Sequence, residues 1–141
     1  MTEHLTGKCL CGAVRFAFDA QSTNVDACHC SMCRQWTGGP LMVVEQQGPI
    51  AFDGAENIAL YASSEAMERG FCKVCGSSLF TKLTGADHYF VSAGTIAEDA
   101  KLNLVLEIFF DRKPAYYSFA NKTRKMTAEG FAKAWAGETN G

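Results

Sequence analysis

The sequence lacks both a long apolar run and an excess of positive charge. No stretch approaches the roughly 18 apolar residues of a membrane-spanning helix, so we expect no membrane partner. The 141 residues include 13 Lys and Arg against 15 Asp and Glu, a formal net charge of −2, which argues against general electrostatic binding to nucleic acid. Residues 1–8 include no apolar segment typical of a secretory signal. We therefore expect a cytoplasmic protein with no nucleic acid partner.

Proline is scarce, with three residues, and neither a repeat nor a linker rich in Pro, Gly and Ser interrupts the chain. At this length we expect a single domain over residues 1–141. Over residues 12–19, Val14, Phe16 and Phe18 alternate with other residues, which is typical of a half-buried strand. Similar short runs occur at 41–45, 58–62, 78–83, 88–93 and 104–110. The pattern predicts a mainly β fold with antiparallel sheets.

Two segments are predicted to be helical. The first is residues 31–37, which Gly38 closes. The second is a short C-terminal helix that Thr127 caps, with Phe131 and Trp135 four residues apart on one face. We interpret the C-terminal helix as a packing element without chemistry.

Cysteine is the residue type that points to function. There are seven, an odd number that disulfides cannot all use, and without a secretory signal such thiols usually serve metals or catalysis. The outer clusters, Cys-x-Cys and Cys-x2-Cys, supply two thiols each. They predict one structural zinc site made by Cys9, Cys11, Cys72 and Cys75. The middle cluster predicts a catalytic zinc with an open position, held by Cys28, Cys30 and Cys33.

Glycine supports the outer site, because Gly12 and Gly76 each follow the second thiol of a pair. A zinc knuckle turns its backbone N–H groups toward the sulfurs, and glycine adopts the required angles without steric cost. Since the two pairs lie far apart in the chain, one ion would join two distant hairpins and contribute folding free energy directly.

The middle cluster allows four interpretations. It could hold a second zinc, an iron–sulfur cluster, a redox dithiol at Cys30 and Cys33, or inert thiols. Iron–sulfur clusters usually take four thiolates, and this cluster has three. The βαβ pattern expected around a thioredoxin-like dithiol is missing from the sequence. His29 lies between two of the cysteines, and alternation in an extended segment turns it away from an ion that they hold. Our preferred interpretation is that His29 is an ordinary polar residue. The alternative is that it supports the metal ligands from behind.

Three thiolates and one zinc ion carry a net charge of −1, so this zinc would be a weak Lewis acid. A soft site suits a soft fourth ligand, and a substrate thiol there would be held as thiolate. Such a thiolate can attack a small aldehyde and form a hemithioacetal. Arg34 directly follows the cluster and is a candidate for holding a substrate carboxylate, with a surface arginine as the alternative. The segment 112–125 holds five basic residues interleaved with aromatic ones, a pattern that can indicate single-stranded nucleic-acid binding. We interpret it first as a strand edge with an exposed loop, and a pocket for an anionic thiol is the intermediate alternative.

The three cysteine motifs are GKCLCGAVRF at 7–16, CHCSMCR at 28–34 followed by Thr37-Gly38, and FCKVCGSSLF at 71–80, and SAGTI follows at 92–96. In that order they resemble the glutathione-dependent formaldehyde-activating enzyme family, which includes centromere protein V. The resemblance implies a β-tent fold with two zinc ions and the same division of the cysteines into structural and catalytic ligands. It also implies a carbon–sulfur lyase activity that interconverts S-hydroxymethylglutathione with formaldehyde and glutathione.

The sequence departs from the family pattern near its end. Glu107 begins the run Glu-Ile-Phe where many relatives have His, and Tyr116-Tyr117 replaces a frequent Trp. Two rivals to the lyase hypothesis remain at this point. One is a zinc-stabilised binding module, in which a protein group such as His29 closes the second site. The other is a zinc hydrolase, for which Asp26 is the nearest candidate base.

Overall fold

The computed structural model describes residues 2–140, and the side chains of its last helix as far as Trp135. The fold is mainly β, as predicted, and strands from the whole length of the chain contribute to two sheets. The Cα positions group into two compact units. Unit 1 comprises Met1–Asn24 and Val43–Asn103, and unit 2 comprises Val25–Met42 and Leu104–Gly141. The single domain over residues 1–141 stays a prediction.

The smaller sheet lies in unit 1 and places the first cysteine pair in a hairpin loop. It consists of antiparallel strands in the order β1-β2-β5, namely β1 (Glu3–Lys8), β2 (Arg15–Ala20) and β5 (Ala51–Asp53). Phe16 and Phe18 of β2 are buried and Arg15 and Asp19 are exposed, so the alternation predicts the core face correctly. The loop between β1 and β2 carries Cys9 and Cys11.

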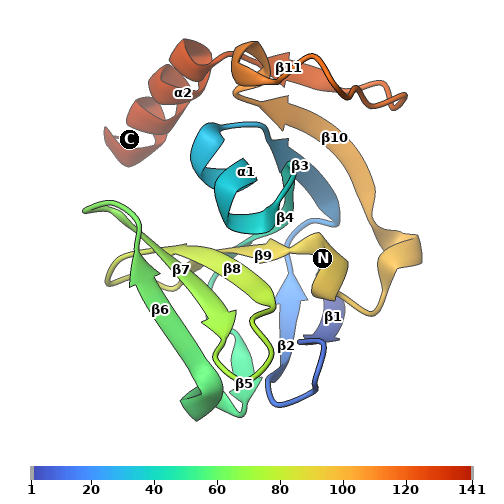
Figure 1. Ribbon diagram of the computed structural model, residues 1–141, viewed down its shortest axis with the longest axis vertical. Helices are drawn as coiled ribbons and strands as arrows, with labels where there is room; N and C mark the ends of the chain where they lie inside the picture. Colours follow the sequence, from blue (N-terminus) through green and yellow to red (C-terminus); the bar gives the residue numbers. More distant parts are fainter. Residues whose placement is uncertain (1, 141) are drawn as a thin grey trace. The chain divides into compact units, whose positions relative to one another are not determined.

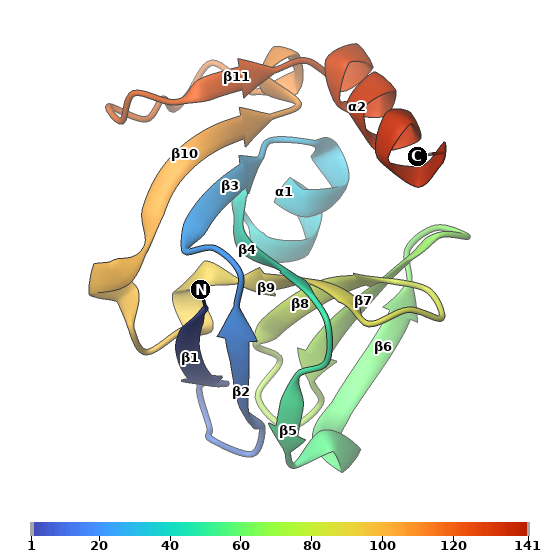
Figure 2. The same cartoon turned by 180° about the vertical axis from the view of Figure 1, so that it is seen from behind.

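Five further strands are hydrogen-bonded neighbours in unit 1, all antiparallel (Figure 2). Their order is β4 (Leu41–Gln47), β9 (His88–Ser92), β8 (Ser78–Leu83), β7 (Met67–Cys72) and β6 (Ile58–Ala62). The β7–β8 turn carries the second cysteine pair. Three 3-10 turns connect the elements of this unit, η1 (Ala55–Asn57), η2 (Ala93–Thr95) and η3 (Asp99–Lys101).

Aromatic side chains from both strand groups form the core of unit 1. Phe52 of β5 lies 5.6 Å from Phe80 and 6.0 Å from Tyr89, measured between ring centroids. Phe80 and Tyr89 meet edge to face at 5.1 Å. Such ring contacts add to the free energy gained by burying apolar surface, so this cluster holds β5 against β8 and β9.

Unit 2 combines three strands of the larger sheet with two α-helices (Figure 1). Its strands have the order β11 (Arg124–Met126), β10 (Asn103–Ile108) and β3 (Asn24–Cys28), and its helical segments are α1 (Ser31–Thr37), η4 (Phe110–Arg112) and α2 (Ala128–Asn140). β10 and β11 run parallel, unlike the antiparallel arrangement predicted from the sequence. The difference arises because the segment 109–123 carries the chain back before β11 begins.

The two predicted helices form where the sequence signals place them. α1 ends at Gly38, whose φ of 86° is left-handed, a conformation common just after helices. The Thr127 hydroxyl accepts a hydrogen bond from the Gly130 N–H at 3.0 Å and so caps α2. Phe131 and Trp135 stack at 5.8 Å. None of the helices within residues 2–140 has the length and apolar character needed to cross a bilayer.

Candidate metal centres

Four cysteine sulfurs gather in unit 1, from two hairpin loops. One loop joins β1 and β2, and the other joins β7 and β8. The sulfurs of Cys9, Cys11, Cys72 and Cys75 all lie within 4.8 Å of one another. Cys9 Sγ is 3.7 Å from Cys11 Sγ, which is 3.9 Å from Cys72 Sγ. Four sulfurs at about 2.3 Å from one tetrahedral zinc would be about 3.8 Å apart. The observed separations therefore fit a zinc ion without rearrangement.

Each cysteine pair has the backbone geometry of a metal-binding knuckle. Gly12 and Gly76 adopt φ values of 81° and 82°, the left-handed conformation that glycine takes without strain. The backbone N–H of Val14 points to Cys9 Sγ at 3.3 Å, and that of Val74 to Cys72 Sγ at 3.4 Å. Hydrogen bonds to sulfur favour the thiolate form that metal binding requires.

The middle cluster lies entirely in unit 2, where β3 ends and α1 begins. The sulfurs of Cys28, Cys30 and Cys33 lie within 4.8 Å of one another. Cys30 is the N-cap of α1, and its sulfur accepts a hydrogen bond from the Cys33 N–H at 3.3 Å. The first turn of the helix therefore brings the third thiol back beside the first two.

The crowding of these three sulfurs is chemically consistent with a bound cation. Hydrogen bonding to Cys30 raises the pKa of Cys28 well above its ordinary range. The same hydrogen bond lowers the pKa of Cys30 to about 2. Neighbouring thiolates repel one another, so the protons are divided unequally among the group. A divalent ion removes that conflict because it binds all three as thiolates.

No fourth Cys, His, Asp or Glu joins this cluster within the part of the chain that the structure describes. Asp26, the candidate base of a hydrolase, is not among the grouped side chains. His29 does not join them either, although it separates Cys28 from Cys30 in sequence. Zinc sites with three protein ligands usually keep one position for a ligand from outside the protein.

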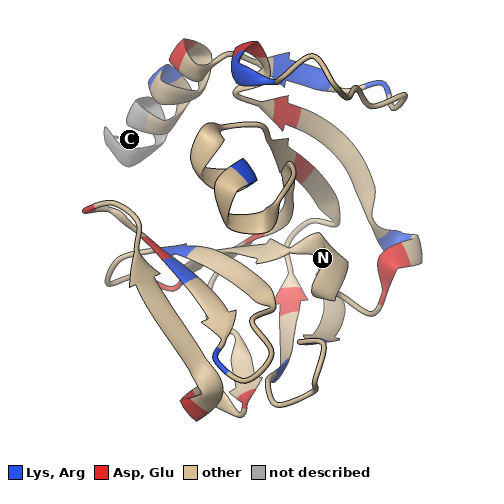
Figure 3. Cartoon of the chain, in the orientation of Figure 1, with Lys and Arg blue, Asp and Glu red and all other residues tan. Residues whose placement is uncertain are grey.

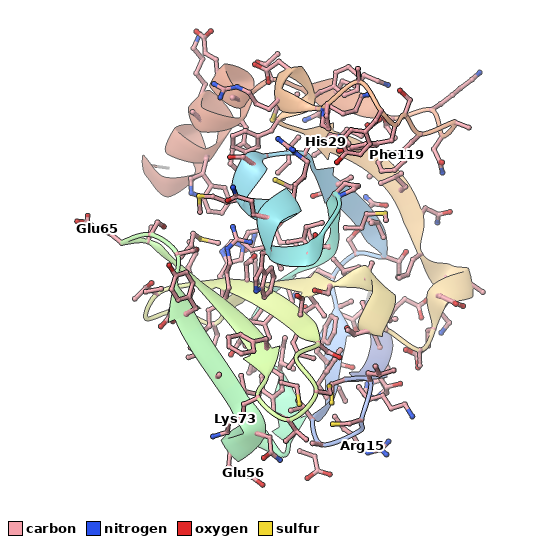
Figure 4. The ribbon with its side chains drawn as sticks, in the orientation of Figure 1. Arg15, His29, Glu56, Glu65, Lys73 and Phe119 are labelled. Carbon is pink, nitrogen blue, oxygen red and sulfur yellow. The ribbon has the colours of Figure 1, made fainter. Side chains whose placement is uncertain are left out.

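The His29 ring instead makes two hydrogen bonds with other side chains. Its side chain is fully buried, with 0% exposed. Nδ1 lies 2.6 Å from the Tyr117 hydroxyl, and Nε2 lies 2.8 Å from Oε1 of Glu107. The ring also packs 5.6 Å from Phe119, beside which it appears in Figure 4. Both ring nitrogens are thus used within unit 2.

Glu107 is a charged residue in the interior, with 2% exposed. Burial raises the pKa of its carboxyl, but hydrogen bonds from Thr123 and His29 outweigh that effect and leave the pKa below its ordinary value. Oε2 accepts from the Thr123 hydroxyl and lies 3.7 Å from Lys125 Nζ. A buried carboxylate is tolerated when it is paired and hydrogen-bonded in this way.

Sequence reasoning missed this network. It treated His29 as an ordinary polar residue and recorded Glu107 and Tyr117 as departures from a family pattern. One signal was available, because Glu107 is the only charge in the otherwise apolar run from 104 to 110. A lone carboxylate in a buried strand needs a partner, although the sequence does not reveal which histidine or hydroxyl provides it.

Arg34, the predicted contact for a carboxylate, is anchored beside the middle cluster. It lies on α1, directly after Cys33, and its Nε donates to the backbone carbonyl of His29 at 2.9 Å. The side chain is half-buried. One of its five N–H groups is used in this bond, and the bond fixes the guanidinium close to the cysteines.

Comparisons with known proteins agree with the family resemblance over most of the chain. Residues 4–112 match the family described as glutathione-dependent formaldehyde-activating enzyme. An uncharacterized lyase of Schizosaccharomyces pombe is 33% identical over 129 residues, which cover 91% of this chain and 94% of the relative. A Halomonas elongata protein, provisionally named a glutathione-dependent formaldehyde-activating enzyme, is 33% identical over 85 residues, 54% of each chain.

A solved structure supports the fold. The crystal structure of a Rhodobacter sphaeroides protein superposes with a TM-score of 0.56 and 23% sequence identity. The match covers 65% of this chain and 87% of that one. At this identity the likeness concerns the fold alone.

Proposed function

The chain belongs to the glutathione-dependent formaldehyde-activating enzyme family, and from this premise we propose that it is a zinc-dependent carbon–sulfur lyase. Its substrate would be the adduct of a small thiol, such as glutathione, with a small aldehyde, such as formaldehyde. Two zinc ions per chain would serve it, a structural ion held by Cys9, Cys11, Cys72 and Cys75 and a catalytic ion held by Cys28, Cys30 and Cys33.

The observation that carries the proposal is the contrast between the two cysteine groups. Four sulfurs can complete a tetrahedral coordination shell. Three sulfurs leave one coordination position, and no further Cys, His, Asp or Glu of the described residues joins them. Structural zinc sites are closed and catalytic sites keep one position open. A binding module would need a side chain to close the second site, and the ring nitrogens of its nearest candidate, His29, bond to Tyr117 and Glu107.

Zinc held by three thiolates would supply a soft position that favours a substrate thiol as its thiolate, with the thiol proton released to solvent. In the condensing direction the thiolate sulfur forms a bond to the aldehyde carbon. The carbonyl π pair moves to oxygen, which takes up a proton from solvent, and the product is a hemithioacetal. In the lyase direction the hydroxyl loses that proton, the carbon–sulfur bond breaks, the aldehyde is released, and the thiolate takes up a proton and leaves as the thiol.

Basic residues in unit 2 match the charge of such a thiol. Arg34 is the one basic residue of α1, and its fixed guanidinium is suited to hold a carboxylate. Further Lys and Arg residues gather on β11 and the turn before it (Figure 3). Glutathione carries two carboxylates, and we assign the contact with one of them to Arg34.

The test is calorimetry of the zinc-loaded protein with glutathione, in buffers of different ionisation enthalpy. A thiol that becomes a metal ligand releases a proton near neutral pH, so the observed enthalpy should depend on the buffer. Cys30→Ser should abolish the signal and Arg34→Ala should weaken it. Met32→Ser, an exposed change inside the same motif, is the control and should bind normally.

A second set of measurements defines the substrate. Cysteine, glutathione and larger thiols are compared with and without formaldehyde, and adduct formation and breakdown are followed for each. Absence of thiol binding to the zinc-loaded protein at millimolar concentration would replace the lyase proposal with that of a zinc-stabilised binding module.

A further inference from the structure

β6 is the outer strand at one end of the larger sheet, where β7 is its hydrogen-bonded neighbour (Figure 1). Its sequence, IALYA, contains neither a charged residue nor a proline. The other outer strands of the described sheets, β1, β5 and β11, each contain charged residues. Charges and prolines on an outer strand hinder its pairing with another chain. β6 therefore lacks two of the features that usually protect a sheet edge.

Two hydrogen bonds at the ends of β6 fix which of its residues bond to β7. The Lys73 N–H donates to the Asn57 carbonyl at 2.9 Å, and the Ser63 N–H donates to the Met67 carbonyl at 3.1 Å. Both pairs continue the antiparallel register of β6 with β7. Hydrogen-bonded and non-hydrogen-bonded pairs alternate in such a register. Residues 59 and 61 therefore bond to β7, and residues 58, 60 and 62 turn their main-chain groups toward the open edge.

These three residues, Ile58, Leu60 and Ala62, present a row of donors and acceptors to another strand. The N–H of Ile58 is already used, because it donates to the carbonyl of Ala55 in η1. The N–H groups of Leu60 and Ala62 and the three carbonyls remain for a partner strand. Leu60 is 53% exposed and Tyr61 is 63% exposed, and neighbouring side chains of a strand point to opposite faces. One large apolar side chain therefore stands on each side of the open backbone.

The row is complementary to its own copy. An antiparallel copy placed about a two-fold axis at Leu60 sets Ile58 opposite Ala62 and Ala59 opposite Tyr61. The two Leu60 residues then exchange both of their main-chain hydrogen bonds, and the N–H of each Ala62 donates to the opposite Ile58. Tyr61 meets the small Ala59 in a non-hydrogen-bonded pair, where side chains approach most closely. Every residue of the strand is paired in this register.

The charges beyond the ends of β6 favour the same antiparallel arrangement. Figure 4 shows Glu65 at one end of β6, and Glu56 with Lys73 at the other. All three side chains are exposed. A two-fold axis places the Glu65 end of each copy beside the Lys73 end of the other, whereas parallel strands would place the two Glu65 residues side by side. Opposite charges across an interface favour one orientation over another.

We propose that two copies of the chain associate through β6, with the strands antiparallel about a two-fold axis at Leu60. Such an interface is isologous, the usual form in symmetric dimers. Two five-residue strands bury less than the roughly 1,200 Å² of a stable interface, so the dimer forms as the protein concentration rises. The inference is independent of the proposed lyase activity, because β6 carries none of the cysteines.

Analytical ultracentrifugation of the zinc-loaded chain tests the association, with a phosphine reductant present so that no intermolecular disulfide contributes. Between about 10 μM and about 1 mM protein, the average mass should rise from 15.3 kDa toward twice that value. Leu60→Lys sets two like charges opposite each other at the axis, so the dimer dissociation constant should increase at least about tenfold. Tyr116→Lys is the control, a similar change at a side chain that is 74% exposed in unit 2, and it should match the wild type.

Amide hydrogen exchange followed by NMR reports the same pairing in the wild type, without a variant. The N–H groups of Ala59 and Tyr61 bond to β7 and should exchange slowly at every concentration. Those of Leu60 and Ala62 face the open edge, so they should exchange rapidly in dilute protein and more slowly as the dimer forms. A dimer in which the Leu60 and Ala62 amides exchange as rapidly as in the monomer would use another surface, and the inference would be overturned.

The remaining outcomes are equally decisive. A wild type that stays monomeric at about 1 mM overturns the inference, whether or not the protein acts on a thiol adduct. Leu60→Lys that dimerises as well as the wild type also overturns it. The Tm and zinc content of both lysine variants are compared with those of the wild type first. If Leu60→Lys folds poorly, the exchange rates of the wild type decide the question.

Discussion

The backbone N–H of Leu10 donates to the hydroxyl of Ser77 at 3.0 Å, across 67 positions of the sequence. The same hydroxyl lies 3.2 Å from Cys75 Sγ. Leu10 stands between the first two cysteines of the four-cysteine cluster, and Ser77 follows the last one. One small side chain therefore contacts both knuckles of the cluster, in addition to any ion that the sulfurs hold.

Replacement of that hydroxyl should loosen the structural site. We expect Ser77→Ala to lower the free energy of unfolding by about 1 kcal/mol, the usual value of one hydrogen bond, and to raise the rate at which a chelator removes the more tightly held zinc. Thermal unfolding and chelator competition measure the two effects. Ser78→Ala, the same change one position later, is the control. Equal behaviour of the two variants would contradict the bridging role.

Metal content should be two zinc ions per chain at most. The four-sulfur group completes a shell and the three-sulfur group does not, so substoichiometric loading should come from the latter. Stepwise chelation with a colorimetric zinc reporter should therefore release one ion readily and the second only slowly. A metal-free preparation that keeps its folded state would rule out the structural role.

Mutation should separate the two groups by their effect on stability. Cys75→Ser opens the site that joins two hairpins of unit 1, and structural zinc sites contribute about 10 kcal/mol or more to folding in small peptides. We expect a loss of several kcal/mol and a Tm lower by on the order of 10 °C. Cys30→Ser should remove one ion and lower the Tm by a few degrees at most. Similar damage from both variants would refute the division into structural and catalytic sites.

The acid side of the stability profile should depend on Glu98. Its carboxylate accepts from the N–H and the hydroxyl of Thr6, both at 2.7 Å, and these bonds hold its pKa below the ordinary value. A lowered folded-state pKa stabilises the protein above the unfolded-state pKa of about 4.3. That stability is lost as the pH falls through the folded-state value.

Glu98→Gln should accordingly be less stable than the wild type at pH 7, by on the order of 1 kcal/mol, and the difference should shrink below about pH 4. Denaturant unfolding at a series of pH values measures it. Asp99→Asn, an exposed neighbour, is the control and should show a much smaller change. A constant difference between Glu98→Gln and wild type at every pH would contradict the assigned hydrogen bonds.

The sequence predicts best where a single local signal determines the structure. The α1 helix has the predicted bounds because Gly38 supplies the left-handed residue after it. The two cysteine groups were predictable because knuckle spacing is local and the outer pairs complement each other. Two of the short apolar runs, those that form β6 and β8, also have the expected bounds.

What the sequence does not predict depends on contacts between distant residues. The parallel pairing of β10 and β11 follows from the path of the segment between them, which contains no regular pattern. Phe109 begins that path with a φ of 55°, an uncommon conformation for a residue with a side chain. The hydrogen bond between His29 and Glu107 spans 78 positions of the sequence. Neither residue type indicates which distant side chain will be its partner.

The compactness of the middle cluster determines the order in which a growing chain becomes able to bind metal. Cys28, Cys30 and Cys33 need only the end of one strand and the first turn of α1, so this set is complete as soon as residue 33 has left the ribosome. The other set must wait for Cys75 and must close a loop of 61 positions between Cys11 and Cys72. During synthesis, the first complete set of candidate metal ligands is therefore the one with fewer cysteines, and the four-cysteine set of unit 1 is completed last.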